Sequence, residues 1–223
     1  MPLAARSGTK ANCPVRVVDH LLFCAGLQPS VAAEVLRLMG SSGRHYHGLS
    51  HLGALWSRHR KYAPAAGFAG AGPSRLVACA IAFHDAVYEP LRDDNETRSA
   101  ALWREAAPRD MAPGEVEWVA ATIEATANHL AVADAGNEPA RLRLWVLDLD
   151  LTPLGERPAL FDRHTGQLRR EFAALDDAEW RRRRCAFLRQ VAAAPRIYRS
   201  PPLQAVFERQ ARENVARALR LGA

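Results

Sequence analysis

The sequence lacks several features that mark whole classes of protein. Its 223 residues contain no uncharged run of about 18 residues, so we expect no transmembrane helix. The four cysteines form no CxxC pair, which argues against a zinc ribbon and against a dense disulfide framework. The first dozen residues have no apolar core of the kind that a signal peptide needs. We therefore expect a soluble protein in a reducing, cytoplasmic setting.

Lysine is almost absent, although the chain is basic. Lys10 and Lys61 are the only lysines among 30 basic residues, and the formal net charge is +6. Such a charge raises the question of a nucleic-acid partner. However, the arginine run 181–184 would spread around a helix rather than form one stripe, and acidic residues such as Glu179 lie beside it. We expect no nucleic-acid partner, because the charge suits a small anionic substrate at least as well.

The pattern of apolar residues predicts an all-α fold. Apolar residues make up 48% of the chain and recur at spacings of three and four from about residue 30 onward, which is typical of helices. Segment 75–88 is almost uninterrupted in its hydrophobicity and predicts a buried central helix. Segment 141–151 alternates like a strand, but nothing elsewhere offers it a partner, so we predict a helix there as well.

The remaining helices follow from caps, prolines and glycines. Two loops are expected, at 61–74 and 89–95. We predict a single helical domain over 16–223 after a disordered start over 1–15. Helices are expected over 30–38, 50–60, 95–107, 113–129, 158–175, 177–194 and 202–221.

Two groups of histidines stand out. His45, His47 and His51 lie within seven residues, and a spacing of four places His47 and His51 on one face of a helix. The adjacent pair His84 and Asp85 comes at the end of the segment predicted to be most buried. A lone buried histidine is usually a hydrogen-bonded core residue, so neither group is decisive alone.

Two carboxylates interrupt an apolar segment. Asp148 and Asp150 need a cation, a hydrogen-bond cluster or the surface, because an isolated buried carboxylate is costly. Combined with the histidines, they supply two imidazoles and two carboxylates. That set suits a divalent ion such as Mn²⁺, Fe²⁺, Zn²⁺ or Ni²⁺ and leaves positions for water and substrate.

These residues fit a known pattern. His51, the pair His84 and Asp85, and Asp150 resemble the H…HD…D motif of the HD superfamily of metal-dependent phosphohydrolases. The chain is most similar to a bacterial branch of predicted phosphohydrolases within it, over roughly residues 30 to 221. The similar segments are RHYHGLSHL (44–52), FHDAVYEP (83–90), DNETRSA (94–100), DLDLTPLG (148–155), LRREF (168–172) and RIYRSP (196–201).

The resemblance implies a function and a metal site. It implies an HD-type helical bundle whose central site holds one or two divalent ions (Mn, Fe, Ni, Zn or Mg) and hydrolyses a small phosphorylated metabolite, such as a nucleotide. The implied ligands are His51, His84, Asp85 and Asp150. Asp148 remains the alternative last ligand, because spacing alone does not separate it from Asp150.

One departure from the family concerns the first histidines. The branch usually has Asn where this chain has Gly48, within a Tyr-His-Asn-x-x-His segment. A similar segment occurs in cyclic-nucleotide phosphodiesterases, where the first His donates a proton and the second binds metal. Carried over, His47 becomes a candidate general acid and His51 a ligand. Gly48 removes an amide that could orient one of them.

Further candidates surround the motif. Arg44 and Arg98 are candidate phosphate-binding residues, although either could be a surface arginine. Glu96, with Asp94, could anchor the attacking water or a second metal. The alternative is a helix cap at the start of the following helix.

Two more residues are candidates for the pocket. His129 could bind substrate or an extra metal, or complement a helix dipole. Tyr88 could line the pocket or belong to the core.

Two other functions remain open. A few HD-type proteins bind two irons and cleave substrates with oxygen, which here would need His129 and a carboxylate as further ligands. A non-catalytic regulatory domain would bind metal or nucleotide without turnover. We expect a small phosphorylated ligand and no membrane partner. The sequence leaves the oligomeric state open, a homodimer included.

Overall fold

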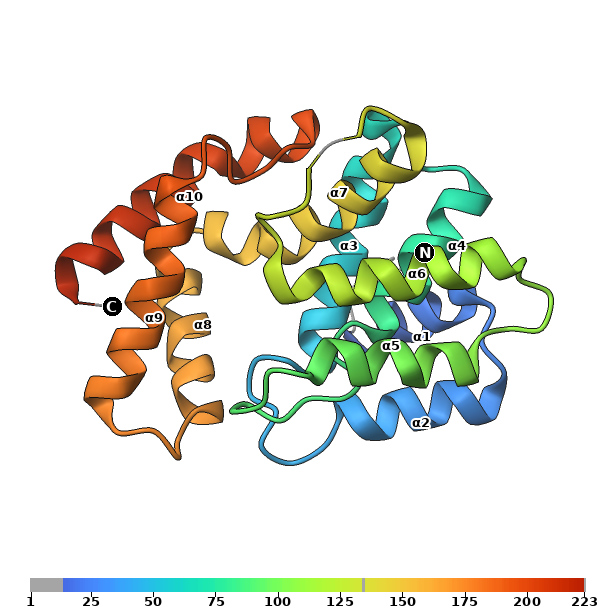
Figure 1. Ribbon diagram of the computed structural model, residues 1–223, viewed down its shortest axis with the longest axis horizontal. Helices are drawn as coiled ribbons and strands as arrows, with labels where there is room; N and C mark the ends of the chain where they lie inside the picture. Colours follow the sequence, from blue (N-terminus) through green and yellow to red (C-terminus); the bar gives the residue numbers. More distant parts are fainter. Residues whose placement is uncertain (1–13, 134, 223) are drawn as a thin grey trace, which may run out of the picture.

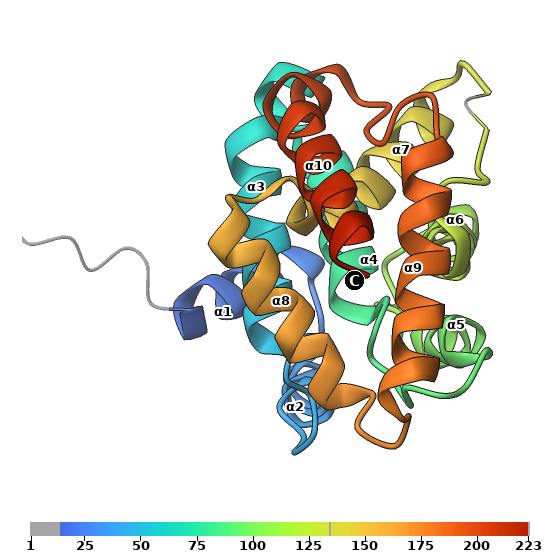
Figure 2. The ribbon, with the colours of Figure 1, turned by 90° about the vertical axis from the view of Figure 1, so that its left-hand side faces the viewer.

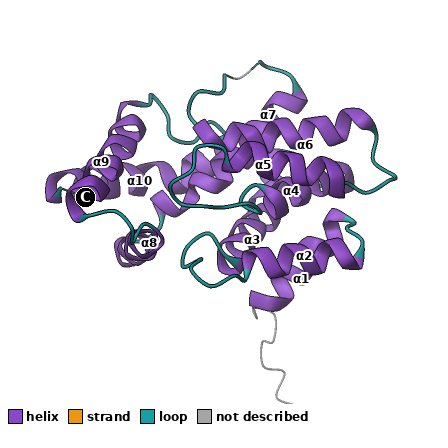
Figure 3. Cartoon of the chain, turned by 60° about the horizontal axis from the view of Figure 1, so that its bottom comes forward, coloured by secondary structure: helices purple, strands orange, loops and turns teal. Residues whose placement is uncertain are grey.

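The computed structural model describes residues 14–133 and 135–222, and all regular structure in those residues is helical (Figure 3). This confirms the all-α prediction. None of the described helices is long and apolar enough to cross a membrane. The helices are α1 (Pro14–Ala25), α2 (Pro29–Met39), α3 (Leu49–Ala66), α4 (Ala71–Phe83), α5 (Asn95–Ala106), α6 (Pro113–Ala125), α7 (Glu138–Leu151), α8 (Pro158–Glu171), α9 (Asp177–Ala193) and α10 (Pro201–Leu221), with short 3₁₀ turns η1 (Thr126–Asn128) and η2 (Thr152–Gly155).

The helices form two groups that meet at α3 and α7. In Figure 1 the first six helices occupy the right-hand side, where α1 packs on α3 and α4, and α5 packs on α6. The last three helices occupy the left-hand side, where α10 packs on η2 and α9. Figure 2 views this second group from its outer side, with α8, α9 and α10 in front of the earlier helices.

The most buried helix is α4, as the hydrophobicity of segment 75–88 predicted. Seven consecutive residues, from Val77 to Phe83, are buried, so this helix has no solvent-facing side in its second half. It ends at Phe83, five residues earlier than predicted. His84 and Asp85 therefore follow the helix directly, at its C-terminal end in the middle of the molecule.

The strand-like segment is helical, as predicted. Helix α7 begins after Asn137, whose side-chain oxygen accepts a hydrogen bond from the backbone N–H of Ala140 at 2.8 Å. Nearly every residue from Leu142 to Leu151 is buried, on all sides of the helix. Burial all round explains why the segment shows no helical periodicity.

Some predicted boundaries were wrong. The predicted loop 61–74 is mostly helix, because α3 continues through Pro64 to Ala66 and α4 begins at Ala71. Gly67, which follows α3, has a φ of +80° that suits glycine. Helix α1 was not among the predicted helices. The predicted disordered start lies outside the described residues except for its last two, which begin α1. The predicted helix 113–129 ends at Ala125 and continues as η1.

Candidate functional site

Three segments bring the predicted metal-binding side chains together. His51 lies in the first turn of α3, His84 and Asp85 follow α4, and Asp150 lies in the last turn of α7. The His51 and His84 Nε2 atoms are 3.3 Å apart. Asp85 Oδ2 lies 3.0 Å from His84 Nε2, and Asp150 Oδ1 lies 2.9 Å from His51 Nε2. These four residues are called the His-Asp cluster below.

The geometry of the cluster fits a metal ion. Ligand atoms of His51, His84 and Asp85 lie within 4.8 Å of one another. His84 Nδ1 donates to the carbonyl oxygen of Ile81 at 2.9 Å, so that Nε2 faces the cluster. Asp85 Oδ2 is buried and lies 3.0 Å from His84 Nε2. A buried carboxylate needs a positive partner, which is either a protonated histidine or a cation.

The electrostatics of the cluster favour a positive charge. Burial alone would raise the pKa of Asp150, but His84, His129 and His51 outweigh it and hold that pKa well below the usual value. Burial likewise opposes protonation of His84, yet Asp85 and Asp150 raise its pKa well above the usual value. The two carboxylates are therefore ionised and attract either protons on the histidines or a cation between them.

Asp148 and Asp150 have different surroundings. Asp148 is fully buried, and its Oδ2 accepts hydrogen bonds from the backbone N–H groups of Arg199 at 2.7 Å and Ser200 at 2.6 Å. The Arg199 guanidinium also pairs with Asp148 Oδ1 at 3.1 Å. Asp148 thus ties α7 to the segment before α10, whereas Asp150 faces the histidines. Asp150 also contacts His129, whose Nε2 lies 2.6 Å from Oδ2.

His47 is held by a carboxylate that the sequence analysis missed. Its Nδ1 lies 2.7 Å from Glu171 Oε2 on α8, and the Glu171 side chain is fully buried. Glu171 Oε1 accepts the backbone N–H groups of Tyr46 at 2.7 Å and His47 at 2.9 Å, and Tyr88 donates its hydroxyl to Oε2 at 3.0 Å. The Tyr88 ring packs against His47 at 4.4 Å between centroids. Four hydrogen bonds therefore fix this pair.

Glu171 also favours the charged form of His47. Burial opposes protonation of the imidazole, but the negative charges of Asp85 and Glu171 outweigh it, and the pKa of His47 is raised. Because Nδ1 is engaged by Glu171, the Nε2 side of the ring remains for other partners.

The structure gives the two candidate phosphate-binding arginines other partners. Arg44 Nη1 donates to the carbonyl oxygens of Asp85 at 2.6 Å and His47 at 3.0 Å, and Nη2 donates to that of Ala86 at 2.9 Å. Arg44 therefore joins the backbone of the two histidine segments. Arg98, on α5, pairs with Glu89 of the preceding loop at 2.6 Å.

The candidate water-anchoring carboxylates lie at the start of α5. Glu96 stands in its first turn and Asp94 is the N-cap residue, paired with Arg92. No interaction described for these residues connects either of them to the His-Asp cluster. Both residues stand at the start of the helix, as the capping alternative expects, but the Asp94 side chain makes no capping hydrogen bond.

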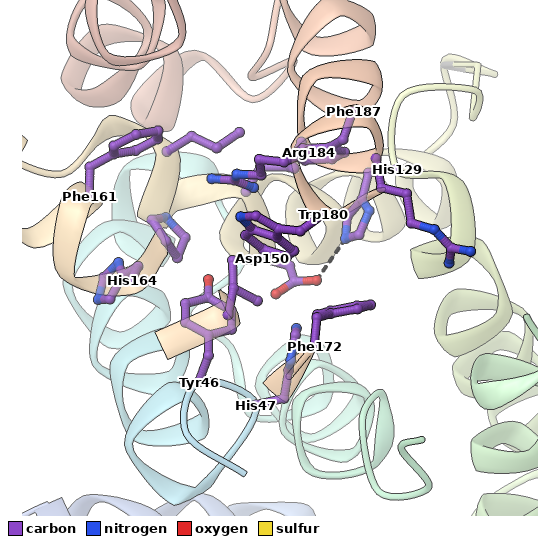
Figure 4. A pocket seen from close by; sticks show the side chains of 15 residues that line it. Tyr46, His47, His129, Asp150, Phe161, His164, Phe172, Trp180, Arg184 and Phe187 are labelled. Atoms are coloured by element: carbon purple, nitrogen blue, oxygen red, sulfur yellow. Dashed lines mark hydrogen bonds and ion pairs between the residues drawn. The ribbon is translucent and has the colours of Figure 1, made fainter. Parts of the chain in front are cut away.

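A pocket of about 300 Å³ opens beside the cluster (Figure 4). His47, His129 and Asp150 form one polar side, and a dashed line in Figure 4 marks the contact between the last two. The other walls are mainly apolar and aromatic and come largely from η2, α8 and α9. Their side chains are those of Tyr46, Leu151, Pro153, Leu154, Phe161, His164, Leu168, Phe172, Trp180, Arg183, Arg184 and Phe187.

The chain matches no family model and no curated protein. The functional argument therefore depends on the motif residues and their geometry.

Proposed function

We propose that the chain is a metal-dependent phosphohydrolase of the HD type, acting on a small phosphorylated metabolite such as a nucleotide. The observation that carries the proposal is the convergence of His51, His84, Asp85 and Asp150 in one buried cluster at the edge of a ligand-sized pocket. Two imidazoles and two carboxylates suit Mn, Fe, Ni, Zn or Mg ions. The buried Asp85 Oδ2, whose ion-pair partners among the described residues are the two histidines, supports this further.

Each residue of the site has its own role in the proposed reaction. The His-Asp cluster would hold the cation, which when bound lowers the pKa of a water molecule and polarises a phosphoryl oxygen. His47 would donate its Nε2 proton to the departing oxygen of the ester, a task for which a raised pKa is suited. Glu171 is a positioning residue, because it orients the ring and stabilises the imidazolium. Arg44 fixes the backbone at His47 and Asp85.

The test is replacement of Asp85 by Ala, with Asp93→Ala as the control. Asp93 is an exposed carboxylate in the loop before α5, so its loss changes the charge equally without touching the cluster. We expect Asp85→Ala to lose the bound metal, measured by inductively coupled plasma mass spectrometry. It should also lose hydrolysis of a panel of nucleotides and aryl phosphates, while Asp93→Ala keeps both. Activity retained in Asp85→Ala without metal would refute the proposal.

One observation supports a second candidate function. Asp150 contacts His51 through Oδ1 and His129 through Oδ2, so His129 could serve a second cation. Two cations would also suit an HD-type di-iron oxygenase. Metal analysis separates the two functions: two irons per chain, without phosphatase activity, would favour the oxygenase.

A further inference from the structure

One arginine in the pocket has no ion-pair partner. Arg184 on α9 forms no ion pair with any described carboxylate, and its Nε is buried without a hydrogen-bond partner. Its closest polar contact is the Thr165 hydroxyl, at 3.4 Å from Nη2. The next two arginines before it on α9, Arg182 and Arg183, both pair with Glu179 at 2.6 Å. Arg184 alone in this run turns an unpaired charge toward the pocket.

The surroundings of Arg184 are aromatic instead. Its guanidinium carbon lies 5.7 Å from the ring centroid of Phe161 and 5.6 Å from that of Phe187. Burial lowers the pKa of Arg184 to about 10, so the group stays charged at neutral pH. Cation–π contacts offset only part of the hydration that a buried guanidinium loses. A pocket built this way attracts an anion.

The aromatic side chains of Phe172 and Trp180, called the aromatic wall below, limit the kind of chemical group that can carry the anion. Phe172 and Trp180 pack at 5.5 Å between centroids, and Figure 4 shows Trp180, Arg184 and Asp150 around the same space. The volume of about 300 Å³ is at the lower end for ligand sites. Such a volume suits a small ligand. Flat aromatic groups also gain from stacking on such side chains.

We propose that Arg184 binds an anionic oxygen of the substrate's phosphate, and that the aromatic wall binds a flat aromatic group esterified to it. The substrate class is then a small aromatic phosphate ester. This inference rests on the proposed phosphohydrolase function, because only that function makes the bound ligand a substrate. The pocket itself can be tested by binding. It also assigns to Arg184 the phosphate contact that the sequence assigned to Arg44 and Arg98, since both of these have other partners.

The experiment uses two phosphonates that share a head group. Phenylphosphonate and methylphosphonate cannot be hydrolysed as esters, and only the first carries a ring. Isothermal titration calorimetry on the Mn²⁺-loaded protein should show phenylphosphonate binding about tenfold or more tightly. Trp180→Ala should remove that preference. Arg184→Met should weaken both ligands about tenfold, whereas Arg181→Met, an exposed arginine on the same helix, should leave both unchanged.

A stability measurement keeps the result interpretable. Because Arg184→Met removes a half-buried charge that has no ion pair with a described carboxylate, its melting temperature should equal or exceed that of the wild type. Arg184→Lys keeps a charge and should recover part of the binding. A lowered melting temperature in Arg184→Met with unchanged phosphonate binding would show that Arg184 is structural and would overturn the inference.

The outcomes also separate the inference from the proposed function. Equal binding of the two phosphonates by a protein that hydrolyses phosphate esters would refute the aromatic pocket and leave the hydrolase. Tight, Arg184-dependent phenylphosphonate binding by a protein that hydrolyses no phosphate ester would refute the hydrolase and leave the pocket.

Discussion

Replacing Glu171 by Gln tests whether this carboxylate controls His47. The side chain is fully buried and accepts four hydrogen bonds, from the Tyr46 and His47 backbone, the His47 ring and the Tyr88 hydroxyl. Gln keeps the size of the side chain and can accept the two backbone N–H groups through its remaining oxygen. Its amide N–H₂ then faces His47 Nδ1, so the imidazole must accept there and lose its positive charge.

The expected effects differ in size for stability and for catalysis. Hydrogen bonds to charged groups contribute about 1.5–3 kcal/mol each. Since most of the four can re-form around Gln, we expect Glu171→Gln to lower the free energy of unfolding by about 1–3 kcal/mol. General acid catalysis contributes about 10²–10⁴-fold. The turnover should therefore fall by about 10²-fold or more, with the metal content unchanged.

The assay compares two aryl phosphates. The 4-nitrophenolate ion leaves readily without a proton, whereas phenolate needs one, so the loss in Glu171→Gln should be larger for phenyl phosphate than for 4-nitrophenyl phosphate. His47→Gln should show the same pattern, and the double variant should lose no more than either single variant, because the two residues act as a unit. Tyr88→Phe, which removes one of the four hydrogen bonds, is the matched control and should retain most of the activity.

Equal losses for the two esters would refute the reasoning. They would mean that Glu171 supports the fold of the site and not proton donation by His47. Additive losses in the double variant would mean that the two residues act separately.

Two further predictions concern stability. His59 is buried between Trp56 and Trp145, and burial lowers its pKa to about 4. The stability that the neutral His59 side chain gives the folded protein is present above the unfolded pKa of about 6.5 and is lost as pH falls toward 4. The stability difference between wild type and His59→Gln should thus shrink by about 3 kcal/mol from pH 7 to pH 4 in urea denaturation, and a constant difference would contradict a neutral His59. Asp148→Ala removes the fully buried carboxylate that pairs with Arg199 and accepts the Arg199 and Ser200 backbone N–H groups. It should therefore lower the free energy of unfolding by about 3–5 kcal/mol without loss of metal binding, as measured by chemical denaturation and metal analysis; loss of metal at unchanged stability would contradict the structural role.

Helix periodicity was enough to predict most of the fold, and its failures have physical reasons. Helix α1 contains Val15, Val17 and Val18, which are weak helix formers, and it is stabilised by packing on α3 and α4. A proline normally ends a helix because it removes one N–H···O=C bond and clashes with the preceding turn, and α3 does end two residues after Pro64, at Ala66. Tertiary packing decided the case of α1.

The candidate site was predictable only where residue type sufficed. Histidine and aspartate at motif spacing identified the cluster, because few structural roles require that combination. The roles of Glu171 and Arg184 were not predicted: LRREF entered only as a segment similar to the family, and WRRRRC looks like an ordinary charged helix surface. Their roles come from burial, which depends on how α8 and α9 pack. Arg44 is the opposite case. Its proximity to His47 in sequence suggested a phosphate-binding role, but its guanidinium donates to the backbone carbonyl of His47 instead.

The order of the residues along the chain has a consequence for biosynthesis. The four cluster residues, the last of which is Asp150, all precede Glu171 and Arg184, which lie on α8 and α9. A chain is synthesised from its N-terminus. Under the proposed function, the emerging protein would therefore have its metal-binding residues before the residues that orient His47 and bind the phosphate, so cation binding could precede catalysis.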